Sequence, residues 1–379
     1  MELRKYRFDE ISVNYDKKRI PLSGTQREKR KGEYRYYGAQ GVIDYIDNYI
    51  FDGTFLLIAE DGENLKSKKQ NIAQVVTGQF WVNNHAHIVT GNDLCDTHYL
   101  CYLINSMDLS GYVTGSAQPK LSQANLNAVS LLLPRMEIQK KIVDYLRKID
   151  EKIELNTQIN KNLLEQALIL YTTQFSSLEK NGCIGNYCTV KSGFAFKSSW
   201  WAKIGVKVLK IGSINQDNLN LLECSYVDED KVDKAKDFVV KAGDLLIAMT
   251  GATIGKFAMV PYSSEVLLVN QRVGKFFLGN NPLEKLPFIY CTLKQPEVYD
   301  EIVNRGQGSA QPNISASDIM RIPCVIPSQE AINNFNDAAQ PLFDLIISNQ
   351  QENQQLSTLR DTLLPKLMSG ELDVSDIDL

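Results

Sequence analysis

Long apolar segments and paired cysteines are both missing from this chain of 379 residues. No apolar run approaches the roughly 18 residues of a transmembrane helix, and the first residues lack the apolar stretch of a signal peptide. The seven cysteines are an odd number and include no Cys-x-x-Cys pair, which is typical of a reduced, cytoplasmic protein. We therefore expect a cytoplasmic, globular protein without a membrane partner, long enough for two or three domains.

Motifs for catalysis and cofactor binding are missing as well. All three histidines fall within fourteen residues, which leaves no Ser-His-Asp or Cys-His constellation to assemble. The nearest match to the methyltransferase motif Asn/Asp-Pro-Pro-aromatic is Asn281-Pro282-Leu283, and it fails. Gly251–Lys256 resembles a phosphate loop, but it is too short and Phe257 replaces the Ser/Thr. The sequence therefore predicts no catalytic residue, no bound cofactor and no enzyme activity.

The histidines do cluster with two cysteines. Zinc accepts such ligands, but Cys-x-x-His-x-x-Cys is not an established zinc spacing. Cys95 and Cys101 also lie in an apolar stretch, where thiols pack as small hydrophobic groups. We expect no metal here, which leaves His85 or His87 free to approach a base or a phosphate.

Charge is distributed unevenly along the chain, whose formal net charge is −4. Residues 15–35 hold eight Lys/Arg against three acids, whereas residues 329–379 hold two against nine. Affinity for DNA depends on the local density of cations that face phosphates. The basic stretch is therefore compatible with DNA binding, although a solvated loop would have the same composition.

An internal repeat determines the architecture. Residues 115–126, which begin Gly-Ser-Ala-Gln-Pro, recur as residues 308–319 at an offset of 193. In each copy a serine, Ser122 or Ser315, is placed to cap a short helix. A short apolar strand and a proline follow in both copies, and the proline opens a long helix.

The two long helices carry matching heptads. Apolar residues recur every seven positions, with asparagines at equivalent seam positions: Asn156 and Asn160 in the first helix, Asn349 and Asn353 in the second. A polar residue in an apolar seam fixes the register of paired helices. The sequence therefore predicts that the helices pack on each other; the alternative is that each lies on its own domain with its asparagines in water.

Upstream of each repeated segment lies a mixed, strand-rich region. Residues 55–62 are similar to 244–251, and residues 81–83 to 268–270, with short apolar runs punctuated by Gly and Asn. We expect an α+β fold with an internal pseudo-twofold repeat. The expected parts are a domain over 1–134, a central helix over 135–180, a domain over 181–327 and a C-terminal helix over 328–379.

This arrangement resembles the specificity subunits of Type I restriction–modification systems. The resemblance rests on the duplicated Gly-Ser-Ala-Gln-Pro segment, on residues 37–41 (Tyr-Gly-Ala-Gln-Gly) and 192–197 (Ser-Gly-Phe-Ala-Phe-Lys), and on the ending Leu-Pro-Lys-Leu-Met-Ser-Gly-Glu-Leu at 364–372. These motifs span nearly the whole chain, and their order makes the match specific.

The resemblance implies a DNA-reading subunit without catalysis of its own. Each variable domain would be a target-recognition domain that reads half of a bipartite site in double-stranded DNA. Two antiparallel helices would separate the domains and dock two modification subunits, which are adenine methyltransferases; restriction subunits would translocate and cleave. A coiled-coil scaffold that spaces two protein-binding domains is the alternative.

Arg and Lys suit phosphates, and Asn, Gln and Arg suit base edges. For each single residue a solvated surface role is an equal alternative. In the order of the chain, the residues expected to contact DNA are Lys17, Lys18, Arg19, Arg27, Lys29, Arg30, Lys66, Lys68, Lys69, Lys197, Lys210, Thr250, Lys256, Gln271 and Arg272.

Overall fold

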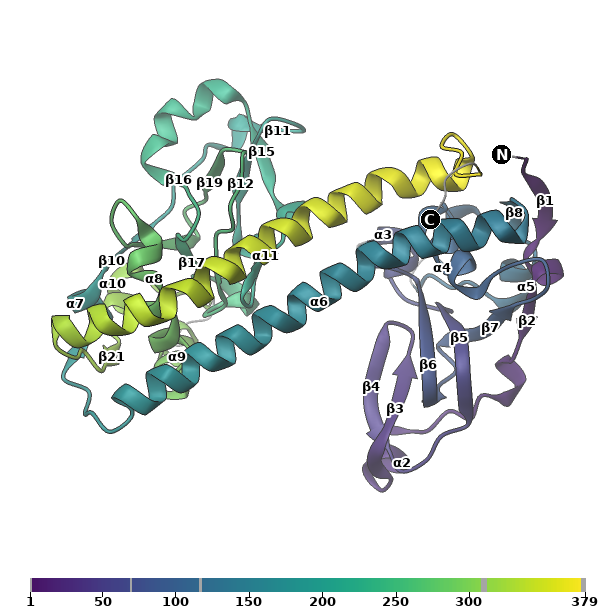
Figure 1. Cartoon of the computed structure of the whole chain (residues 1–379), viewed down its shortest axis with the longest axis horizontal. Coiled ribbons are helices and arrows are strands. Elements are labelled where there is room, and N and C mark those ends of the chain that lie inside the picture. The colour runs from purple at the N-terminus through teal and green to yellow at the C-terminus, as the bar shows by residue number, and fades with distance from the viewer. Residues whose placement is uncertain (1, 69, 116–117, 308–311, 376–379) are drawn as a thin grey trace. The chain divides into compact units, whose positions relative to one another are not determined.

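The computed structural model describes residues 2–68, 70–115, 118–307 and 312–375. The chain divides into two compact units. The first unit comprises residues 1–151 and 357–379, and the second comprises residues 152–356. Figure 1 labels the helices and strands along the chain. Among the described residues, no helix is long and apolar enough to cross a membrane.

The first unit contains a six-stranded sheet. Its antiparallel centre is β5 between β6 and β7, while β3 runs parallel to β6. Gly53 and Gly78 face each other across β5 and β6 with φ angles of 130° and 96°, which only glycine adopts readily. The strand order is β2 (Ser12–Asn14), β7 (Ala86–Gly91), β5 (Phe51–Ala59), β6 (Ala73–Val82), β3 (Lys31–Gly38), β4 (Gly41–Ile46).

Short helices and one further strand pair complete this unit. The side chain of Ser122 accepts a hydrogen bond from the N–H of Asn125, so the predicted helix cap is confirmed. The elements are β1 (Arg4–Arg7), which pairs with β8 (Ser130–Leu133), and the helices α1 (Phe8–Ile11), η1 (Asp16–Lys18), α2 (Gly24–Glu28), α3 (Asn64–Ser67), α4 (Thr97–Ser106), η2 (Ser110–Tyr112) and α5 (Gln123–Asn127).

The second unit contains two larger sheets. One has the order β10 (Thr189–Ser192), β20 (Val273–Phe277), β17 (Leu245–Ala248), β18 (Phe257–Met259). The other has the order β11 (Trp201–Ala202), β15 (Ser225–Val227), β12 (Val206–Leu209), β19 (Leu267–Val269), β16 (Val239–Val240). A hairpin of β13 (Ile214–Asn215) and β14 (Asn218–Leu219), and the pair β9 (Gly182–Cys183) with β21 (Pro323–Cys324), are separate.

The helices of this unit are mostly short. Ser315 accepts a hydrogen bond from the N–H of Asp318 and caps α10, as expected. The main helices are α7 (Ile184–Tyr187), α8 (Leu286–Leu293), α9 (Pro296–Gly306) and α10 (Ala316–Met320). The 3₁₀ helices are η3 (Ser198–Trp200), η4 (Ile211–Ser213), η5 (Leu221–Glu223), η6 (Glu229–Lys231), η7 (Asp233–Phe238), η8 (Gly251–Thr253) and η9 (Pro282–Glu284).

The sequence repeat extends to the hydrogen bonds of the two units. The N–H of Gly62 donates to the carbonyl of Pro119 (3.1 Å), and the N–H of Gly251 donates to that of Pro312 (3.0 Å). Strand pairing repeats as well: β5 is antiparallel to β7 as β17 is to β20, and β3 is parallel to β6 as β12 is to β19. The chain thus folds the same topology twice.

The two long helices are α6 (Met136–Phe175) and α11 (Gln329–Ser369). In the second unit they run antiparallel, because Asn156 donates to Asn353 (2.9 Å) and Asn349 donates to Asn160 (2.8 Å). The predicted packing of the asparagine seam is therefore confirmed in this unit.

Candidate nucleic-acid interface

Five loops gather at one end of the sheet in the first unit, and we call them its loop end. Main-chain hydrogen bonds join them: Glu60 to the carbonyl of His85 (2.9 Å), Asn83 to that of Tyr37 (3.0 Å) and Gly62 to that of Pro119 (3.1 Å). A hollow of about 350 Å³ lies among them. The loop end consists of residues 15–19, 38–41, 60–62, 83–85 and 118–120.

Ion pairs beneath this loop end hold it together. The guanidinium of Arg19 lies 3.0 Å from Glu60 and 3.4 Å from Asp16, and it donates to the carbonyl of Ala86 (2.7 Å). Lys120, from the repeated segment, lies 3.3 Å from Glu60. Because the Arg19 side chain is only 14% exposed, its contacts in the structure are internal, and a contact with DNA stays a prediction.

A buried histidine connects this network to the repeated segment. His87 Nδ1 lies 2.6 Å from Asp16, and its Nε2 lies 2.8 Å from the carbonyl of Leu121. Burial by itself would raise the pKa of the Asp16 carboxyl, but the hydrogen bonds from His87 and from the N–H of Ile88 bring that pKa below its ordinary value. Side-chain contacts of Lys120 with Glu60 and of His87 with the Leu121 carbonyl therefore hold the repeated segment in place. They add to the main-chain bond between Gly62 and Pro119.

The predicted basic residues of the first unit come from two segments. Lys17 and Lys18 are exposed at the loop end, in η1. Arg27 and Arg30 precede β3, and their guanidinium groups lie over Tyr36 and Trp81, which pair across β3 and β6 two residues before Gly38 and Asn83. The Trp81 indole also donates to the carbonyl of Ile20 (2.6 Å), the residue after Arg19.

The arginines around α2 pack on aromatic rings. Arg27 lies over Tyr36 (5.3 Å) and pairs with Asp44 (3.1 Å). Arg30 lies over Trp81 (4.9 Å) and forms an ion pair with Asp47 (2.9 Å), the residue after β4. Lys29 is exposed between them. These contacts hold α2 on the β3–β4 hairpin, and their side chains remain partly open to solvent.

The remaining predicted lysines of this unit lie elsewhere. Lys66 donates to the carbonyl of Gly115 (3.0 Å), and Lys68 donates to that of Met107 (2.8 Å). Both side chains bind main-chain oxygens of neighbouring loops. Lys69 lies outside the described residues.

The second unit has an equivalent loop end. Its main-chain bonds run from Asn270 to the carbonyl of Leu209 (2.9 Å), from Gln271 to that of Phe194 (2.9 Å) and from Met249 to that of Arg272 (3.0 Å). It consists of residues 194–197, 210–212, 249–251, 270–272 and 312–313. The fold brings together the predicted residues Lys197, Lys210, Thr250, Gln271 and Arg272, while Lys256 closes the base of the same loop through its bond with Ala248 (2.8 Å).

Sequence reasoning missed an aromatic cluster beside this loop end. Lys197, Lys231 and Lys234 surround the ring of Trp200 at 5.2–5.9 Å, and Lys210 lies 3.9 Å from the ring of Trp201. The signal was weak because the lysines come from segments about thirty residues apart, and residues 228–237 add five acids to three lysines.

The histidines and cysteines of the first unit serve separate purposes. His85 is half exposed at the loop end, 2.6 Å from Asp61, whereas His87 is buried. Burial raises the pKa of the Cys95 and Cys101 thiols. Among the described residues, no three His, Cys, Asp or Glu side chains converge as metal ligands.

The chain matches the family model described as the Type I restriction modification DNA specificity domain over residues 4–165 and again over residues 179–358. It is 22% identical over 378 residues to the Type I restriction enzyme MjaVIII specificity subunit of Methanocaldococcus jannaschii, covering 93% of this chain and 89% of that protein. A local match to a putative type I restriction enzyme specificity subunit of Haemophilus influenzae is 32% identical and covers 36% of this chain and 35% of the relative.

The fold is shared with a solved structure. The S subunit of a Type I restriction–modification system from M. genitalium superposes with a TM-score of 0.60 at 16% identity, covering 99% of this chain and 97% of that one. At this identity the likeness concerns the fold alone.

Proposed function

Because this chain belongs to the Type I restriction–modification DNA specificity family and has two target-recognition domains, we propose that each domain reads one half of a bipartite site in double-stranded DNA through its loop end. The observation that carries this proposal is the recurrence of one main-chain frame with different side chains. The frame bonds Gly62 to Pro119 and Gly251 to Pro312, while the exposed residues differ between the units.

The side chains at the loop ends suit the two tasks of DNA recognition. Lys17, Lys18 and Lys210 are cations for phosphate contacts, which position a protein on the duplex. Asn84 in the first unit and Gln271 with Arg272 in the second carry the groups that pair with adenine or guanine edges. Different base readers on one frame would give each half-site its own sequence.

The long helices serve assembly in this proposal. Large apolar side chains are exposed on them: Ile169 at 63% and Leu155 at 51% in the second unit, and Leu359 at 43% in the first. These side chains are accessible to a protein partner. We infer that two modification subunits dock there, that restriction and translocase subunits join the complex, and that this cytoplasmic chain contributes recognition without catalysis.

A domain exchange tests the proposal. Residues 181–327 would be replaced by the equivalent domain of a relative, and the chain would be co-expressed with its modification subunits. Mapping methylated adenines by sequencing should show one half-site changed and the other intact. A change in both halves, or in neither, contradicts independent reading.

A further inference from the structure

The two loop ends share one turn, which directly follows the strands β6 and β19 of the repeated topology. The turn begins at Asn83 in the first unit and at Asn270 in the second, and both side chains are buried. The side-chain oxygen of Asn83 accepts from the N–H of His85 (2.8 Å), and that of Asn270 accepts from the N–H of Arg272 (3.3 Å). An asparagine side chain commonly closes a turn in this way. The turn therefore holds its exposed residues in the same position in both units.

Each turn presents an amide side chain followed by a basic one. The residues are Asn84 and His85 in the first unit and Gln271 and Arg272 in the second, and all four are exposed. A guanidinium group only donates hydrogen bonds and stays charged at every pH that proteins tolerate. An imidazole nitrogen donates or accepts according to its protonation, which changes near neutral pH. The two units thus place different chemistry at the second of these positions.

Asp61 fixes one nitrogen of the His85 ring. The Nδ1 atom lies 2.6 Å from a carboxylate oxygen of Asp61, whose side chain is mostly buried. A carboxylate oxygen only accepts, so Nδ1 carries a proton and donates it to this bond. The His85 side chain is 49% exposed, and among the residues that the structure describes no hydrogen bond engages its Nε2 atom. The atom that His85 can offer to a ligand is therefore Nε2.

The other charged groups around His85 are paired with one another. Arg19 and Lys120 both lie against Glu60, at 3.0 Å and 3.3 Å. These three residues, Asp61 and His85 line the same hollow of about 350 Å³. Two cations and two carboxylates leave no net charge there. The protonation of His85 consequently sets the charge of the hollow.

The second unit has no carboxylate at the place of Asp61. Asp61 forms an antiparallel bridge with Lys120, and Thr250 forms the equivalent bridge with Asn313, at the offset of the sequence repeat. The hydroxyl of Thr250 does not titrate near neutral pH, and neither does the guanidinium of Arg272. What this position of the second turn offers to a base is therefore the same across the neutral range of pH.

Resting on the function proposed above, we propose that His85 is a specificity-determining residue whose preference for guanine over adenine is set by the protonation of its ring, and that Asp61 positions it. With Nδ1 held by Asp61, the protonated ring donates from Nε2 to the O6 or N7 acceptors of guanine. The neutral ring has a lone pair at Nε2 and accepts from the N6 amino group of adenine. Arg272 donates to guanine in both conditions.

Competition binding at two pH values tests the reader. The assembled complex of this chain with its modification subunits would bind duplexes in which each base pair of both half-sites is changed in turn between G·C and A·T. The ratio of the two affinities is measured at about pH 5.5 and about pH 8.5, which bracket the range in which histidine changes charge. Effects of pH that both duplexes share cancel in this ratio.

The expected change is confined to one half-site. The preference for guanine over adenine should fall by about tenfold between the two pH values at one base pair of the first half-site. That half-site is the one that exchange of residues 181–327 leaves intact. The second half-site, which Arg272 contacts, should show the same ratios at both pH values.

Two substitutions separate the reader from its positioning residue. His85→Arg installs the residue of the second unit, so its guanine preference should be equal at both pH values. Asp61→Asn replaces the carboxylate by an amide that donates as well as accepts, so the neutral ring can keep its proton on Nε2 and remain a donor to guanine. The change with pH should then shrink from about tenfold to about threefold or less. Unaltered ratios at the other base pairs of the half-site show that the turn is intact.

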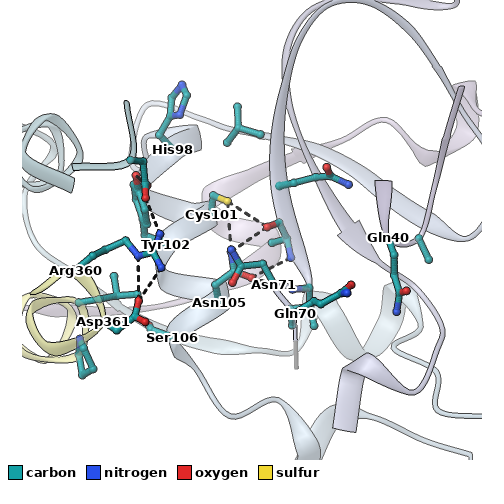
Figure 2. A pocket seen from close by; sticks show the side chains of 18 residues that line it. Gln40, Gln70, Asn71, His98, Cys101, Tyr102, Asn105, Ser106, Arg360 and Asp361 are labelled. Atoms are coloured by element: carbon teal, nitrogen blue, oxygen red, sulfur yellow. Dashed lines mark hydrogen bonds and ion pairs between the residues drawn. The ribbon is translucent and has the colours of Figure 1, made fainter. Parts of the chain in front are cut away.

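A second histidine of the first unit is the matched control. His98 lies on α4, outside the loop end, and is one of the residues around a separate cavity of about 700 Å³ that Figure 2 shows. Burial and the charge of Arg147 lower its pKa. His98→Gln should leave the pH-dependent ratio at the first half-site as it is in the unmodified chain.

The outcomes separate this proposal from the assignment of half-sites to domains. Equal base ratios at both pH values throughout the first half-site overturn it, and so does a pH-dependent ratio that survives in both His85→Arg and His85→Gln. An equal change in the two half-sites also overturns it, because Arg272 does not titrate in this range. A failed domain exchange would instead contradict the proposed function.

Discussion

Asn349 donates a hydrogen bond from its side-chain nitrogen to the side-chain oxygen of Asn160, 2.8 Å away, and both residues are more than nine-tenths buried between α11 and α6. A buried amide pair of this kind costs desolvation unless both partners are present. The pair therefore fixes which residues of the two helices meet, and its contribution is measurable by substitution.

Double replacement of this pair should lower the free energy of unfolding less than single replacement. Asn349→Leu leaves the Asn160 oxygen buried without its donor, and we expect a loss of about 1–3 kcal/mol in the free energy of unfolding. The double change Asn160→Leu with Asn349→Leu removes both polar groups and should recover most of that loss. Urea unfolding of the full chain measures both. Equal losses in the single and double variants would contradict the pairing.

The Asp16–His87 contact should make the first unit sensitive to acid. The pKa of Asp16 is lower in the folded chain than in the unfolded chain, so the unfolded state binds the proton more readily. The stabilisation is complete above the ordinary aspartate pKa of about 3.9 and is lost as pH falls below it. In urea unfolding between pH 2 and 6, the free energy of unfolding should fall less steeply with falling pH for Asp16→Asn than for the unmodified chain. Identical slopes for the two proteins would contradict a stabilising contact between Asp16 and His87.

Lys17 and Lys18 should supply affinity without sequence preference. Changing both to Gln removes two exposed cations beside the first loop end, so the slope of log affinity against log salt should fall by about 2. Methylated half-sites should stay the same. The measurement is DNA binding by the assembled complex at several salt concentrations. Lys148→Gln, an exposed change on α6, serves as the control and should leave the slope unaltered.

Gln271 should contribute to the sequence of one half-site only. Gln271→Ala removes a side chain that can bind an adenine edge bidentately, a contact worth about 1–3 kcal/mol of discrimination. Sequencing of methylated DNA should show relaxed preference at one base pair of the half-site read by the second unit. The reciprocal variant Asn84→Ala should relax only the other half. Relaxation in both halves by either variant would contradict the assignment.

Much of the fold could be read from local patterns in the sequence. The caps formed by Ser122 and Ser315 and the asparagine seam follow from rules of helix ends and heptads, and they are present in the structure. Thr250, Gln271 and Arg272 were expected to contact DNA on their side-chain chemistry, and the structure places all three at one loop end. These features depend on residues close in sequence or on duplicated order.

The rest depended on contacts that no local pattern encodes. Arg19 was expected on the surface, but the fold supplies Glu60 and Asp16 as its partners from distant segments. Within the basic stretch of residues 15–35, Arg27 and Arg30 lie over Tyr36 and Trp81, and no spacing in the sequence indicates these rings as their partners. Lys231 and Lys234 reach Trp200 only after the chain has formed two sheets, so propensity and spacing could not reveal them.

The bond between the N–H of Gly62 and the carbonyl of Pro119, with its counterpart between Gly251 and Pro312, is made entirely of main-chain atoms. Such a bond does not depend on the side chains of the loops that it joins. Under the proposed function, mutations at Asn84, His85, Gln271 or Arg272 would change the bases that are read while the main-chain bond keeps the loop in place. New specificities would then be reached by single substitutions that leave the fold intact, and the two half-sites would change independently of each other.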